Sequence, residues 1–194
     1  MELKSRYILL VSVALVSILA DQATKVWARG ALRSPEARRY RVTDKESKKK
    51  ATIEVIEKRV QFRLSFNRGA SFGMFNDSRG SARWWLVITG LLALGIVAYF
   101  MHRPEAESRL FVVGLSLVAG GALGNLIDRI LFGKVTDFIV VWLYKGIRWT
   151  WPWPAFNIAD SVLVVGVSLI MIEIIREGIR SQREGGEKEQ PAQS

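Results

Sequence analysis

Carboxylates stand at the boundaries of two apolar runs in the sequence. Asp128 and Asp137 follow the run that begins at Leu110, and Asp160 stands at the start of "FNIADSVLVVGVSLIMIEII". Ionisable residues near hydrocarbon are costly, so they mark functional sites by default. Two carboxylates in one site can divide the roles of acid and base, because burial and mutual repulsion raise one pKa while the other group stays ionised.

The residue types disfavour most other hydrolytic chemistries. The chain has no cysteine and one histidine, His102, and HExxH and Walker A motifs are absent. We therefore expect no metal and no cofactor, which leaves a metal-free aspartic mechanism as the main hydrolytic option. A purely structural interpretation stays open from spacing alone: Asp160 can cap a helix, and Asp128 can pair with Arg129 at a helix end.

Four apolar segments are long enough to span a membrane. The chain has 194 residues, of which 49% are hydrophobic, and a span needs about 20 mostly apolar residues. Only elements that satisfy their own backbone hydrogen bonds can cross lipid. We predict an α-helical membrane protein, a single membrane domain over 1–194, with helices at about 7–28, 84–101, 110–127 and 156–175.

The order of these spans gathers the polar residues at one membrane face. The loop between the first and second spans must lie on the same side as the loop between the third and fourth. The residues expected at that face are Asp21, Asn67, Asn125, Asp128, Arg129, Asp137, Asn157 and Asp160. His102 belongs to the opposite face.

The two loops on the site side differ in pattern. "VQFRLSF" (60–66) alternates apolar and polar residues, as a half-buried strand does, and "TIEVIE" before it is its expected partner. With "YRVT" (40–43) as a possible third strand, we predict a small β-sheet within about 38–72, over the site. The other loop contains Trp142, Trp149, Trp151 and Trp153, which favour the headgroup region; it is either an interfacial anchor or a cover over a lipid-bearing substrate. The polar tail, 181–194, is predicted to be disordered.

Charge alone leaves the orientation open. The loop 29–83 holds 15 Lys and Arg residues and the loop between the third and fourth spans holds three, against eight on the opposite side, which would place the site in the cytoplasm. Long loops carry less weight, however, and Lys4 and Arg6 beside the first helix fit a cytoplasmic N-terminus. We interpret the net charge of +10 as a means of interacting with anionic lipid headgroups, and we expect no nucleic-acid partner.

Five motifs resemble those of the lipoprotein signal peptidases (signal peptidase II), a family of bacterial aspartic membrane peptidases. They are "DQATK" (21–25), "NRGASFG" (67–73), "GNLIDR" (124–129), "VTDF" (135–138) and "FNIADS" (156–161), in the family's order. The resemblance implies that Asp137 and Asp160 are catalytic. It implies substrate-binding or supporting roles for Asp21, Lys25, Asn67, Gly69, Ala70, Asn125, Asp128, Arg129, Asn157 and Ala159. Ser71 and the insertion 29–59 depart from the usual pattern.

The resemblance also implies an activity and an orientation. The substrate would be a prolipoprotein whose cysteine carries diacylglycerol, cut before that cysteine; membrane lipids and globomycin-type inhibitors are the other expected partners. Both termini would be cytoplasmic, with the site and the sheet at the outer face of the bacterial inner membrane. Two alternatives remain: a small proton-coupled transporter that uses Asp137 and Asp160, or a non-enzymatic assembly protein whose aspartates only cap helices.

Overall fold

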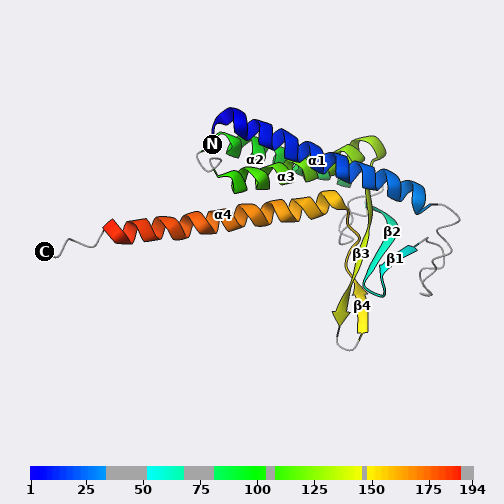
Figure 1. The fold of residues 1–194 in the computed structure, drawn as a ribbon. Coiled ribbons are helices and arrows are strands. Elements are labelled where there is room, and N and C mark those ends of the chain that lie inside the picture. The colour runs from blue at the N-terminus through cyan, green and yellow to red at the C-terminus, as the bar shows by residue number, and fades with distance from the viewer. Residues whose placement is uncertain (34–51, 68–80, 104–107, 146–147, 189–194) are drawn as a thin grey trace.

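Four long helices and four strands make up the described part of the chain (Figure 1). The structure is a computed structural model that describes residues 1–33, 52–67, 81–103, 108–145 and 148–188. The helices are α1 (Leu3–Ala31), α2 (Ser81–Met101), α3 (Arg109–Phe132) and α4 (Ile158–Lys188). All four are long and apolar enough to cross a membrane. The predicted α-helical membrane fold with four spans is therefore confirmed.

Helix α3 is the central helix of the bundle, because it packs against α1, α2 and α4. Small residues allow this close approach, as is usual between helices in lipid. At Gly121 an added Cβ would lie 2.5 Å from the carbonyl oxygen of Ala159 on α4. The outward faces of the other helices are apolar and exposed, as in Leu15, Leu92 and Val164. These faces fit contact with lipid tails.

An antiparallel sheet lies at one end of the bundle, and the N-terminus and the C-terminal end of α4 lie toward the other (Figure 1). Its strand order is β1-β2-β3-β4. Strands β1 (Thr52–Ile56) and β2 (Val60–Asn67) come from the connection between α1 and α2, as the alternation predicted. Strands β3 (Val135–Lys145) and β4 (Arg148–Pro152) come from the connection between α3 and α4. The segment "YRVT" lies outside the described residues.

The Trp-rich segment therefore belongs partly to the sheet, which neither sequence interpretation of it had included. β3 pairs with β2 in a register that sets Phe66 opposite Thr136 and Ser65 opposite Asp137. "VTDFIVVWLYK" is almost continuously apolar, so it lacks the alternation that identified β2. This pairing brings the two site-side loops together into one sheet.

Two helix ends differ from the prediction. The third helix was expected to stop near 127 but continues to Phe132, so Asp128 and Arg129 lie in its last turns. The tail was predicted to be disordered from 181, yet α4 runs to Lys188. An ion pair one helical turn apart supports this extension, because Arg180 Nε lies 2.7 Å from Glu184 Oε1.

The close contact between α3 and α4 predicts that Gly114→Ala destabilises the protein. The new Cβ would lie 2.7 Å from Ile170 Cγ1 and 2.9 Å from the Gly166 carbonyl oxygen. Overpacking of this kind costs about 1–3 kcal/mol. Thermal unfolding in detergent measures it, with Gly95→Ala as the control, since nothing lies within 4 Å of an added Cβ there. A Gly114→Ala protein that melts no lower than the control would contradict the packing.

Candidate active site

Asp137 and Asp160 meet at the sheet end of the bundle and are joined through two asparagine side chains. Asn157 Nδ2 donates to Asp137 Oδ1 at 2.7 Å and to Asn125 Oδ1 at 3.1 Å. Asn125 Nδ2 donates to Asp160 Oδ1 at 2.8 Å. Asp137, Asn125 and Asn157 are buried, while Asp160 is partly accessible. The two carboxylates therefore belong to one continuous hydrogen-bonded unit.

Asn157 and Asp160 form a reciprocal cap at the start of α4. The backbone N–H of Asp160 donates to Asn157 Oδ1 at 3.0 Å, and the backbone N–H of Asn157 donates to Asp160 Oδ2 at 3.1 Å. This is the geometry of a capping box, in which Asn157 is the N-cap. The structural interpretation of Asp160 is thus partly right, although its other oxygen binds Asn125. Both of its oxygens accept N–H donors.

Lys25 fixes the direction of the Asn125 amide. Its ammonium group is fully buried, lies 2.7 Å from Asp21 Oδ2 and 3.8 Å from Asp128 Oδ2, and donates to Asn125 Oδ1 at 3.1 Å. Because Lys25 and Asn157 both donate to that oxygen, the Nδ2 of Asn125 must face Asp160. The cation on α1 thereby controls a contact made on α4.

Asp21 fastens the beginning of α4 to α1. Its Oδ1 accepts the backbone N–H of Ala159 at 2.9 Å. Gln22 Nε2 donates both to Asp21 Oδ2 and to the carbonyl oxygen of Gly124, each at 3.0 Å. Ala159 is fully buried. The residue held here directly precedes Asp160.

Asp128 plays the corresponding part for Asp137, together with two residues that the sequence interpretation missed. Asp128 Oδ2 accepts the backbone N–H of Thr136 at 2.8 Å. Arg29 donates to Thr136 Oγ1 at 2.8 Å and lies 3.4 Å from Asp128 Oδ1. Arg29 follows Lys25 by one helical turn, as Lys25 follows Asp21, and this spacing of four was the available signal.

The structure shows fewer contacts for the remaining candidate site residues. Asn67, at the end of β2, makes a side-chain hydrogen bond to Asp137. Arg129 lies within electrostatic range of Asp128, Asp137 and Asp160. Its buried Nε has no hydrogen-bond partner among the described residues. Gly69 and Ala70 lie outside the described residues.

Asp137 has the environment of an acid that holds its proton near neutral pH. Burial raises its pKa to about 7, and the negative charge of Asp160 acts in the same direction. The hydrogen bond from Asn157, the charge of Lys25 and the hydrogen bond from Asn67 oppose the rise. A protonated Asp137 beside an ionised Asp160 can divide acid and base roles.

We expect Asp160→Asn to lower the pKa of Asp137 from about 7, because the substitution removes a negative charge that disfavours ionisation. Infrared titration of the carboxyl band measures the shift, with Glu184→Gln on the exposed part of α4 as the control. Since the folded pKa lies above the usual 3.8, the folded protein retains a proton that the unfolded chain releases. This contribution to stability is lost as the pH rises between the two values. An unchanged Asp137 titration in Asp160→Asn would contradict the coupling.

Comparisons of the whole chain with known proteins identify the family to which it is similar. A family model described as signal peptidase (SPase) II matches residues 13–176. The chain is 36% identical to the lipoprotein signal peptidase of Clostridium novyi (strain NT), over 87% of this chain and 98% of that protein. It is 34% identical to the lipoprotein signal peptidase of Geobacter sulfurreducens, over 90% of this chain and 96% of that protein.

Solved structures agree with the sequence comparison. One, described as a bacterial membrane enzyme, aligns with a TM-score of 0.66 at 28% identity, covering 87% of this chain and 88% of the other. A second with the same description gives a TM-score of 0.63 at 29% identity, covering 85% and 91%. From the extent of the family match and of these alignments, the chain belongs to the signal peptidase II family.

Proposed function

We propose that the protein removes the signal peptide from diacylglyceryl-modified prolipoproteins by cutting the peptide bond before the lipidated cysteine, with Asp137 and Asp160 as the catalytic pair. The main support for this catalytic pair is the hydrogen-bonded unit in which Asn157 and Asn125 join the two carboxylates. Structural roles alone would not require a partly accessible carboxylate beside a buried one whose pKa is raised to about 7. The family relationship supports the substrate class.

The proposed reaction needs no metal and no covalent intermediate. Asp160 takes a proton from a water molecule as the water oxygen attacks the scissile carbonyl carbon, and Asp137 donates its proton to the carbonyl oxygen. In the resulting diol, the C–N bond breaks as the cysteine nitrogen takes the proton held by Asp160. Asp137 regains its proton from a diol hydroxyl, so the pair returns to its starting state.

The supporting residues divide into two groups in this proposal. Arg129 and Asn67 hold the substrate backbone or its developing charge. The Nε of Arg129, which has no partner within the part of the chain that the structure describes, supports this role. Asn125 and Asn157 already bridge the carboxylates, so their main role is to position the pair. Asp21, Lys25 and Asp128 support the elements that carry it.

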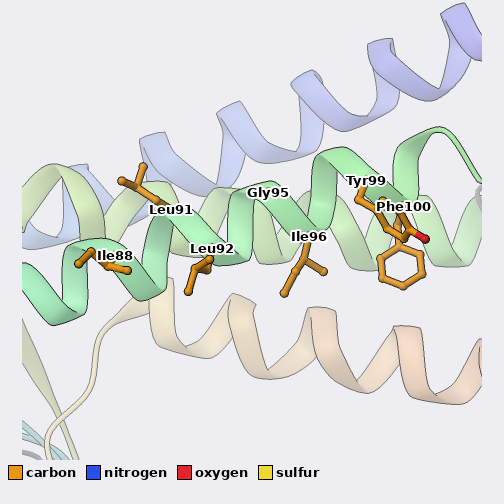
Figure 2. Close-up of a pocket in the computed structure, with 7 residues that line it drawn as sticks. All are labelled: Ile88, Leu91, Leu92, Gly95, Ile96, Tyr99 and Phe100. Carbon is orange, nitrogen blue, oxygen red and sulfur yellow. The ribbon is translucent and has the colours of Figure 1, made fainter.

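An apolar groove along α2 offers room for the acyl chains of such a substrate (Figure 2). Its volume is about 620 Å³, and its lining includes Ile88, Leu92 and Ile96, of which Leu92 and Ile96 point toward α4 in the view. A neighbouring cavity of about 480 Å³ is lined jointly by α2, α3 and α4. Diacylglycerol lying between α2 and α4 would reach the sheet end of the bundle, where α2 begins.

We further propose that the sheet faces the outer side of the inner membrane and that both termini are cytoplasmic. The N-terminus and the end of α4 lie away from the sheet (Figure 1), which fits an even number of spans. A signal peptide enters its membrane from the cytoplasm, so its cleavage site emerges at the outer face. Globomycin-type inhibitors would then bind at the same site.

Asp137→Asn and Asp160→Asn are each expected to reduce cleavage of a lipidated precursor by at least about 100-fold, because each removes an acid–base group. Asparagine keeps the size of the side chain and can still accept the capping hydrogen bond. The purified variants are assayed in detergent, with circular dichroism and thermal unfolding to show that they fold. Glu184→Gln is the control. A folded variant of either aspartate with near-normal turnover would refute the two-aspartate mechanism.

The orientation is tested by labelling engineered cysteines, since the native chain has none. Glu57→Cys lies in the exposed turn between β1 and β2, and Arg183→Cys lies on the exposed end of α4. An impermeant thiol reagent applied to intact spheroplasts should label the first variant alone, and both after lysis. Labelling of Arg183→Cys alone in intact spheroplasts would show an inverted topology and would remove the outer-face cleavage proposal.

A further inference from the structure

Two cations lie close to one aromatic ring at the sheet end of the bundle. Lys134 Nζ lies 3.8 Å from the centroid of the Phe66 ring, and the guanidinium carbon of Arg33 lies 5.4 Å from it. Lys134 follows Gly133, whose left-handed conformation (φ 68°) ends α3 and turns the chain into β3. Arg33 lies just after the end of α1. Both charges thus lie where membrane-spanning helices end.

These two charges have no acidic partner in the described part of the chain. Lys25 and Arg29 on the same helix end are paired with Asp21 and Asp128. No described carboxylate lies within ion-pair distance of Arg33 or Lys134. An aromatic face attracts a cation but carries no net charge, so it leaves the positive charge available to an anion. Among the residues that the structure describes, these two positive charges are therefore uncompensated.

Exposed apolar side chains lie in the last turns of the same two helices. In the last turns of α3, Ile130, Leu131 and Phe132 are 57%, 67% and 49% exposed. Trp27, in the last turns of α1, is 43% exposed. Side chains of this kind lie against acyl chains when a helix crosses a membrane, while cations at its end reach the headgroup level.

We propose that Arg33 and Lys134 bind the phosphate of an anionic phospholipid in the leaflet on the sheet side, with its acyl chains along Leu131 and Phe132. The two cations supply charge-assisted hydrogen-bond donors for phosphate oxygens. The exposed apolar side chains at the same helix ends, here called the apolar band, match the tails of the same molecule. A free anion would use the charges but would leave the apolar band without a role. The lipid is therefore the occupant that accounts for both features.

This lipid site is distinct from the site that contains Asp137. Phe66 and Asn67 are consecutive residues of β2, so their side chains point to opposite faces of the strand. Asn67 hydrogen-bonds to Asp137, whereas the ring of Phe66 makes cation–π contacts with Arg33 and Lys134. The bound lipid would connect the ends of α1 and α3 with β2 from the other side of that strand. Its binding does not depend on the protein's catalytic activity.

The test uses the full protein in nanodiscs of equimolar phosphatidylcholine and phosphatidylglycerol, with lipids that stay bound counted by native mass spectrometry. Lys134→Gln and Arg33→Gln should each weaken retention of phosphatidylglycerol about 5-fold, as expected for one cation near the headgroups. Lys58→Gln is the matched control, because this lysine lies on the same sheet with an exposed side chain paired to Glu57. A photoreactive phosphatidylglycerol should label peptides that contain residues 62–67 and 130–136.

Several results would overturn the proposal. Equal losses in Lys58→Gln and Lys134→Gln would show a general attraction of the basic sheet for anionic lipid. Reduced thermal stability with unchanged lipid retention in both Arg33→Gln and Lys134→Gln would show that the cations only complement the helix C-termini. Competition by soluble glycerol phosphate as strong as that by the lipid would show a site for free phosphate.

Discussion

The candidate site depends on the pairing of one buried charge, the ammonium group of Lys25. A charge without exposure to water is tolerated only when it is paired and hydrogen-bonded. Asp21, Asp128, Asn125 and the Gly124 carbonyl surround Lys25, and they come from α1 and α3. The need to satisfy one cation therefore fixes the alignment of these two helices at the sheet end. It also fixes the amide of Asn125, and through it a hydrogen bond to Asp160.

The same design occurs twice around this cation. Asp21 accepts the backbone N–H of Ala159, and Asp128 accepts the backbone N–H of Thr136. Each of these N–H groups belongs to the residue that directly precedes one of the paired aspartates, Asp160 or Asp137. Two carboxylates, held by Lys25 and Arg29, thus position the two aspartates of the proposed catalytic pair through the main chain. A side chain held by its backbone has few alternative positions, which suits the proposed mechanism, in which the two acids keep a fixed separation.

The four-helix architecture could be predicted from the sequence, but the strand pairing and the hydrogen bonds of the site could not. Hydropathy revealed the four helices, and span order predicted which polar residues would share an end of the bundle. β3 escaped prediction because its continuous apolar run has no strand period and its partner β2 lies far away in sequence. Arg29 and Thr136 were missed because their value depends on Asp128, which was expected beyond its helix. Which amide atom faces which carboxylate follows from three-dimensional packing around Lys25 and cannot be read from residue types.

The dispersal of the site along the chain has a consequence for biosynthesis. Its parts come from α1, β2, α3, β3 and the first turn of α4, and Asn157 and Asp160 are the last to emerge during synthesis. Under the proposed mechanism, a nascent chain with three helices inserted has one aspartate of the pair and lacks the amide that joins it to the other. Proteolytic competence would then arise only when the final helix enters the membrane. Completion of the fold would itself act as the activating step.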